Sequence, residues 1–145
     1  GMLSPLLKAQ ADINVNHIFE ARLHLEAGIA NLAAQHRTSA NLQALQAALD
    51  GMRANFSDDK PAYVKHDMAF HQELANSARN PVFHVIMAAI TDLLREVHLR
   101  YKDRMEYRKL AIREHEAILA AVRERDGERA EAAMQTHLQN AKERV

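Results

Sequence analysis

The stretch HEAILAAVRERDGERAEAAMQTHL, residues 115–138, decides the fold class of this chain. Apolar side chains recur at spacings of three and four residues on both sides of Asp126-Gly127, which is typical of two amphipathic helices. Asp-Gly favours a turn, so we expect an antiparallel helix pair. The apolar sides carry Ile112, His115, Ile118, Leu119 and Val122 before the turn, and Ala130, Met134, His137, Leu138 and Ala141 after it.

The rest of the chain follows the same helical pattern and contains no alternating apolar run that would predict a strand. Only four Gly and three Pro interrupt a sequence rich in strong helix formers. We expect further helices over residues 13–36, 39–55, 61–78 and 81 to about 102, then one after a polar break at 103–106 and a last one from about 128. The predicted fold class is all-α, an antiparallel bundle of about six to seven helices.

Two helix starts and one apolar face are specific enough to test. Thr38 or Ser39 is expected to cap the second helix, and Asn80-Pro81 has the cap and first-turn residues of another helix start. In the helix after Pro81, the pattern predicts an inward apolar face made of Val82, Val85, Ile86, Ala89, Leu93 and Val97.

Composition limits the class of protein. A chain of 145 residues is the size of one domain, and its 19 basic and 19 acidic residues cancel, which argues against a nucleic-acid-binding surface. The absence of Cys, signal peptide and long apolar run predicts a cytoplasmic protein without membrane contact. We expect residues 1–12, which begin Gly-Met, to be a tag remnant and lead-in, and residues 13–145 to form the domain.

Four polar side chains are candidates for a metal site. Asp67 and His71 are four residues apart on one helix face, and the neighbours on that face are apolar, so both should point inward. His115 and His137 lie on the inward stripes of two later helices. One carboxylate and three imidazoles suit a divalent transition metal. The alternative is structural, because nine histidines place some on apolar faces by chance and an Asp-His pair can simply hydrogen-bond.

The remaining histidines and the methionines are assigned no such role. Met52, Met87 and Met134 are expected to fill the core. His98 could face the cavity, and the other histidines are expected at the surface or in the core, namely His17, His24, His36, His66 and His84.

The chain resembles the FCD domain, the C-terminal ligand-sensing domain of FadR-type GntR transcription regulators, over nearly its full length. FEARLHLEAGIANLAAQHR (19–37) is similar to the first helix of that family, and DMAFH (67–71) followed by ARNPV (78–82) resembles its D-x-x-F-H segment. REHEAILAAVRERD (113–126) and AAMQTHL (132–138) resemble its histidine helix and its closing M-x-x-H-L signature.

This resemblance implies a central cavity with Asp67, His71, His115 and His137 as metal ligands, because these positions match the family motifs. Zinc is the first expectation, with nickel, manganese or iron as alternatives. It also implies a small carboxylate effector, and Arg22 is the candidate for its second contact. The alternative for Arg22 is a salt bridge with Glu26, four residues on.

The resemblance further implies a homodimer that binds operator DNA only through an N-terminal winged helix-turn-helix, which has no counterpart in this sequence. A bundle metalloenzyme is the competing class, but Glu-x-x-His pairs and H-E-x-x-H are missing, and Glu116 should project away from the site. We therefore expect no enzyme activity. A third class is a helical dimerisation module without a small ligand.

Overall fold

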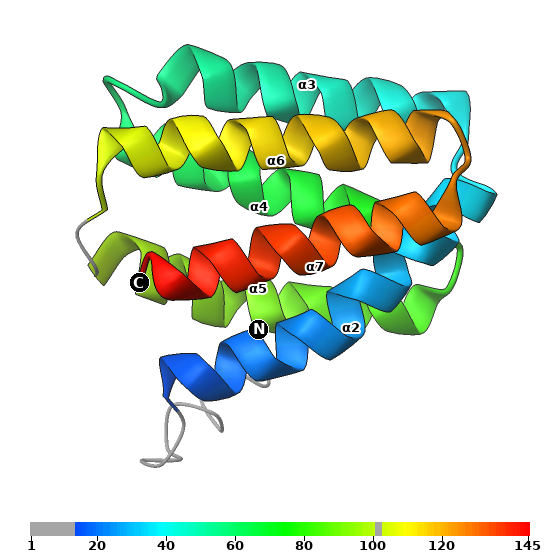
Figure 1. Cartoon of the computed structure of the whole chain (residues 1–145), viewed down its shortest axis with the longest axis horizontal. Coiled ribbons are helices and arrows are strands. Elements are labelled where there is room, and N and C mark those ends of the chain that lie inside the picture. The colour runs from blue at the N-terminus through cyan, green and yellow to red at the C-terminus, as the bar shows by residue number, and fades with distance from the viewer. Residues whose placement is uncertain (1–13, 101–102) are drawn as a thin grey trace.

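The computed structural model describes residues 14–100 and 103–145, and these residues form helices joined by short turns, with no strand among them (Figure 1). The all-α prediction is therefore confirmed. The expected tag remnant at residues 1–12, and Ile13, lie outside the described residues. The helices are α2 (Val15–His36), α3 (Ser39–Asn55), α4 (Lys60–Ser77), α5 (Pro81–Arg100), α6 (Met105–Arg123) and α7 (Gly127–Glu143).

Side-chain caps explain where several of these helices begin. Thr38 caps α3 in a reciprocal capping box with Asn41, as the sequence predicted for Thr38 or Ser39. Asp59 caps α4 by accepting from Ala62 N, and Asp126 caps α7 by accepting from Arg129 N. The expected helix starts were thus correct to within one or two residues.

The turn between α6 and α7 is hydrogen-bonded to the turn between α2 and α3 at the same end of the bundle (Figure 1). Arg125 has a positive φ of 59°, which ends α6 without a glycine at that position. Its guanidinium donates to the backbone oxygens of Gln35 and Arg37 at the turn between α2 and α3. These hydrogen bonds connect the α6–α7 pair to the α2–α3 pair.

The bundle packs α2 against α7 and α3 against α4, while α6 contacts α7 and α4 contacts α5 (Figure 1). Its core is one cluster that includes Ile29, Leu45, Phe70, Ile118 and Leu138, each at most 1% exposed. The inner face of α2 carries alanines, which allow neighbouring helices to approach closely: Ala27, Ala30, Ala33 and Ala34.

The predicted apolar face of α5 is wrong. Val82 and Val85 are 59% and 61% exposed, whereas Met87, Thr91 and Leu94 are buried on the other side of the helix. Because α5 is apolar around most of its circumference, periodicity alone could not choose which side faces the core. None of the described helices is long and apolar enough to cross a membrane.

Candidate metal centre and adjoining cavity

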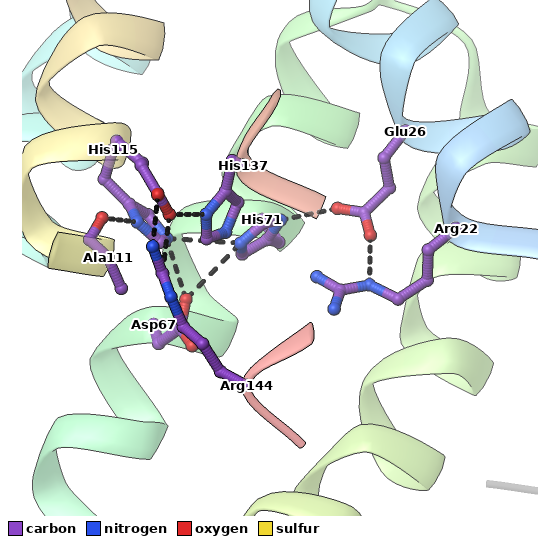
Figure 2. Close-up of polar contacts among 9 residues, drawn as sticks. Arg22, Glu26, Asp67, His71, Ala111, His115, His137 and Arg144 are labelled. Carbon is purple, nitrogen blue, oxygen red and sulfur yellow. Dashed lines mark hydrogen bonds and ion pairs between the residues drawn. The ribbon is translucent and has the colours of Figure 1, made fainter. Parts of the chain in front are cut away.

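Three helices bring the four predicted ligands together inside the bundle (Figure 2). Asp67 and His71 come from α4, His115 from α6 and His137 from α7. All are buried, with exposed fractions between 0% and 6%. One ring nitrogen from each histidine lies within 4.8 Å of the other two, so the three imidazoles form a group that could hold a metal ion.

The Nδ1 atom of each imidazole faces a hydrogen-bond acceptor. His71 Nδ1 donates to Glu26 Oε1 at 2.5 Å, and His115 Nδ1 donates to the backbone oxygen of Ala111 at 2.6 Å. His137 Nδ1 donates to Glu114 Oε1 at 2.8 Å. Holding the proton on Nδ1 leaves the Nε2 lone pair of each ring for a ligand, the arrangement found around metal-binding histidines.

The Nε2 atoms of His71 and His115 converge on each other and on Asp67. His115 Nε2 lies 3.2 Å from His71 Nε2 and 2.8 Å from Asp67 Oδ1, which is 3.3 Å from His71 Nε2. Two ring lone pairs at this separation repel each other unless a proton or a cation lies between them. The donor set of imidazole and carboxylate therefore fits a divalent transition metal.

Glu26 joins the site to Arg22. It accepts from Arg22 Nε at 2.5 Å as well as from His71, and it is 1% exposed. Burial opposes ionisation of Glu26, but the charges and hydrogen bonds of Arg22 and His71 prevail and lower its pKa to about 2. Burial also opposes protonation of His71, yet Glu26 and Asp67 raise its pKa to about 9. When no metal is bound, the His71 ring is therefore protonated near pH 7.

A second carboxylate, which is partly buried, fixes the ring of His137. Glu114 accepts from His137, from Asn140 Nδ2 at 2.8 Å and from both terminal nitrogens of Arg144, at 3.0 and 2.7 Å. Partial burial opposes ionisation of Glu114, but these donors prevail and lower its pKa to about 2. Burial and the neighbouring His115 lower the pKa of His137 to about 3, so this imidazole is neutral and able to act as a ligand near pH 7.

A cavity of about 80 Å³ adjoins two of the four side chains, Asp67 and His137, and Arg22 also lines it. Its other polar lining residues are His98, Asp103, Tyr63, Tyr107, Arg108 and Arg144. By volume it could hold several water molecules or a small organic molecule. His98 thus lines the cavity, as the sequence analysis considered possible, and burial lowers its pKa.

Arg22 makes the salt bridge that the sequence offered as one of two alternatives, and it also lines the cavity. Its Nε atom makes the predicted salt bridge to Glu26, and the whole side chain is 3% exposed. The terminal Nη atoms have no hydrogen-bond partner within the described part of the chain, and Arg22 lines the cavity. A buried guanidinium with donors to spare suits a carboxylate. Its contact with an effector remains a prediction.

Sequence reasoning missed Glu114 and Arg144, and it considered Glu26 only as a partner of Arg22. The spacing offered a partial signal, because Asn140 and Arg144 follow His137 by three and seven residues and so share its helix face. The approach of Glu114 from α6 depends on helix packing. Glu116, which we expected to project away from the site, pairs on the surface with Arg53 at 2.8 Å.

Comparisons with known proteins agree with this fold. Residues 17–140 match the FCD domain family. The chain is 32% identical over 126 residues to the HTH-type transcriptional repressor NanR of Salmonella schwarzengrund (strain CVM19633), covering 86% of this chain and 48% of that protein. NanR of Citrobacter rodentium (strain ICC168) matches with the same identity and coverage. The structure of Streptococcus agalactiae GntR aligns with a TM-score of 0.77 and 26% identity, covering 89% of this chain and 58% of that one. This chain therefore spans about half the length of the curated relatives it matches.

Proposed function

The chain belongs to the FCD domain family, and from this premise we propose that it senses a small organic acid at a metal centre and thereby controls operator binding by a GntR-type transcription regulator. The observation that carries the proposal is the grouping of one ring nitrogen from each of three buried histidines within 4.8 Å of one another, with the Nδ1 atom of each ring held by an acceptor. A purely structural cluster would not require three imidazoles to be oriented toward one another in this way.

Asp67, His71, His115 and His137 would hold the ion, with zinc as the first candidate and nickel, manganese or iron as alternatives. When bound, a divalent ion supplies positive charge and coordination sites for oxygen ligands. Arg22 supports the same assignment, because it lines the adjoining cavity. A carboxylate placed between the metal ion and Arg22 would meet positive charge at both ends.

In the intact protein, the effector would act by binding one arrangement of the bundle more tightly than another. The intact protein would be a FadR-type member of the GntR regulators, and its N-terminal winged helix-turn-helix would make the operator contacts. We also propose a homodimer, because two-fold operator sites are read by two-fold symmetric proteins. Operator DNA lies in the bacterial cytoplasm, and the proposal places the protein there.

The metal part of the proposal is tested on this chain alone. Elemental analysis of protein purified without added metal should find one transition-metal ion per chain, and His115→Ala should remove it. Thermal unfolding should shift upward with metal by mass action, and chelation should reverse the shift. The matched control is His36→Ala, which removes an exposed histidine at the end of α2. Equal metal content in the two variants would contradict the metal assignment.

The sensing part is tested with a panel of hydroxy acids, sugar acids and dicarboxylates in the same thermal assay, with and without chelator. Binding should require both the metal and Arg22, so Arg22→Gln should abolish the ligand shift while retaining metal. On the intact protein, an acid that binds here should change operator affinity. If chelation alters neither stability nor binding, a dimerisation module without a small ligand is the better interpretation.

A further inference from the structure

The cavity beside the proposed metal ligands extends along the helices toward one end of the bundle. Two tyrosines line it there: Tyr63 precedes Asp67 on α4 by four residues, and Tyr107 precedes His115 on α6 by eight. At a rise of about 1.5 Å per residue, these separations correspond to about 6 and 12 Å along the helix axes. This is the end at which α4 and α6 begin and α5 and α7 finish (Figure 1). A molecule bound at the metal centre therefore has its far end near the two tyrosines.

The charged side chains that line this part of the cavity are already paired. Arg108 donates through Nε and Nη2 to the two carboxylate oxygens of Asp103, each at 2.7 Å, and through Nη1 to a backbone oxygen. Lys60 also contacts Asp103, at 3.4 Å. Arg144 uses both of its terminal nitrogens for Glu114. A second carboxylate on the ligand would have to displace one of these pairs, or would lie beside two like charges without a partner of its own.

The lining groups that lack a partner in this part of the cavity are uncharged. The hydroxyls of Tyr63 and Tyr107 and the ring of His98 make no hydrogen bond to any residue in 14–100 or 103–145. Tyr63 is 5% exposed, and burial raises the pKa of its hydroxyl, which therefore remains a donor. Burial lowers the pKa of His98, so its neutral ring offers one donor and one acceptor nitrogen. Such groups suit the hydroxyl oxygens of a ligand.

We infer that Tyr63 and Tyr107 determine specificity, by selecting monocarboxylates with a hydroxylated tail over dicarboxylates of the same length. The inference rests on the sensor function proposed above and names the class of its ligand. The single carboxylate would bind between the metal ion and Arg22, and the hydroxyls of the tail would pair with the tyrosines and with His98. A polar cavity discriminates strongly at such positions, because the wrong ligand leaves buried polar groups or a buried charge unpaired.

Two four-carbon acids that differ only at the far end test this selectivity. Threonate ends in a CH₂OH group and tartrate in a second carboxylate, and both carry two hydroxyls in between. Calorimetric titration of the metal-loaded chain should give threonate an affinity at least about tenfold higher than tartrate of matching configuration. Elemental analysis after each titration verifies that neither acid has removed the metal. Equal affinities, or tighter binding of tartrate, would overturn the inference.

Removal of single hydroxyls assigns the selectivity to residues. Tyr63→Phe and Tyr107→Phe keep the ring, and each should weaken threonate binding about 3- to 10-fold, the loss expected for one hydrogen bond. Glycolate, a two-carbon acid too short to reach the tyrosines, is the matched control and should bind both variants as it binds the unmodified chain. Circular dichroism verifies that both variants fold. Threonate affinity unchanged in both variants would refute the role of the tyrosines.

These measurements separate the inference from the function on which it rests. If glycolate and tartrate bind the metal-loaded chain and threonate binds no better than tartrate, the selectivity is wrong and the sensor proposal stands. If none of the three acids binds the metal-loaded chain, both are wrong.

Discussion

At the residue scale, Glu26 determines much of the chemistry of the site. A single buried carboxylate accepts from Arg22 and from His71, and it therefore links the side chain proposed to bind the effector to a proposed metal ligand. The pKa of His71 is raised because two carboxylates, Glu26 and Asp67, face its two ring nitrogens. Without metal, a proton on His71 takes the place of the cation.

The raised pKa of His71 predicts how the free energy of unfolding depends on pH in protein from which a chelator has removed the metal. The pKa of His71 is raised from 6.5 to about 9 on folding, so its contribution is complete below pH 6.5 and is lost as the pH rises through 9. The loss is on the order of 3 kcal/mol in the free energy of unfolding. Urea titrations between pH 6 and 9.5 measure it, and Glu26→Gln should flatten the dependence. A pH-independent free energy of unfolding in chelated wild-type protein would contradict this account.

Glu114 should control metal affinity without touching the ion. Glu114→Gln weakens the acceptor that orients His137 and should lower metal affinity about 10- to 100-fold, as loss of such partners does in other metal sites. Competition with a chelating dye measures the affinity. Glu116→Gln is the matched control two residues along α6, where the carboxylate pairs with Arg53 on the surface. If both variants lose the same affinity, Glu114 has no specific positioning role.

At the scale of the element, α4 and α7 each combine a side-chain cap at their start with a proposed metal ligand further along the helix. The α4 helix begins at the Asp59 cap and then presents Asp67 and His71 inward one turn apart. The α6 and α7 helices each contribute one histidine to the same site. The site therefore depends on how α4, α6 and α7 are rotated about their own axes relative to one another. Small changes in helix stability should therefore leave the site intact as long as no helix rotates.

Gly28 on α2 tests this separation of stability from function. A methyl group added there meets no atom within 4 Å, and the position is exposed in the middle of a helix. Gly28→Ala should raise the free energy of unfolding by about 0.5–1 kcal/mol, because glycine loses more backbone entropy on folding. Metal affinity should not change. Denaturant unfolding measures the gain, and a destabilised variant would show that α2 is strained at this point.

At the scale of the whole molecule, close packing of α2 decides whether Arg22 and Glu26 reach the site. The alanine face of α2 lies against α7 and α4, and Ala30 and Ala33 are completely buried. Helix α2 thus supplies Arg22 to the cavity and Glu26 to His71, whereas α4, α6 and α7 supply the histidines. Movement of α2 relative to the other helices is the simplest route by which ligand binding could reach an attached DNA-binding domain.

Ala30→Leu should disturb this packing and the site together. Three added carbons in a filled core cost about 1–3 kcal/mol and push α2 outward. The variant should lose effector binding through displaced Arg22 more than it loses metal, since the histidines lie on other helices. Calorimetric titration with metal and then acid separates the two losses. If effector affinity is retained in a destabilised variant, α2 position does not control the cavity.

Sequence by itself determined the helices, the caps of α3 and α5, and the inward direction of Asp67, His71, His115 and His137, because helix periodicity and capping depend on residues within a few positions of one another. It could not decide which apolar side of α5 is buried, since both sides carry suitable residues and packing against α4 and α2 selects one. The partners of the imidazoles were likewise decided by tertiary structure. Glu26 reaches His71 across 45 residues and Glu114 reaches His137 across 23, and such distances close only when whole helices pack.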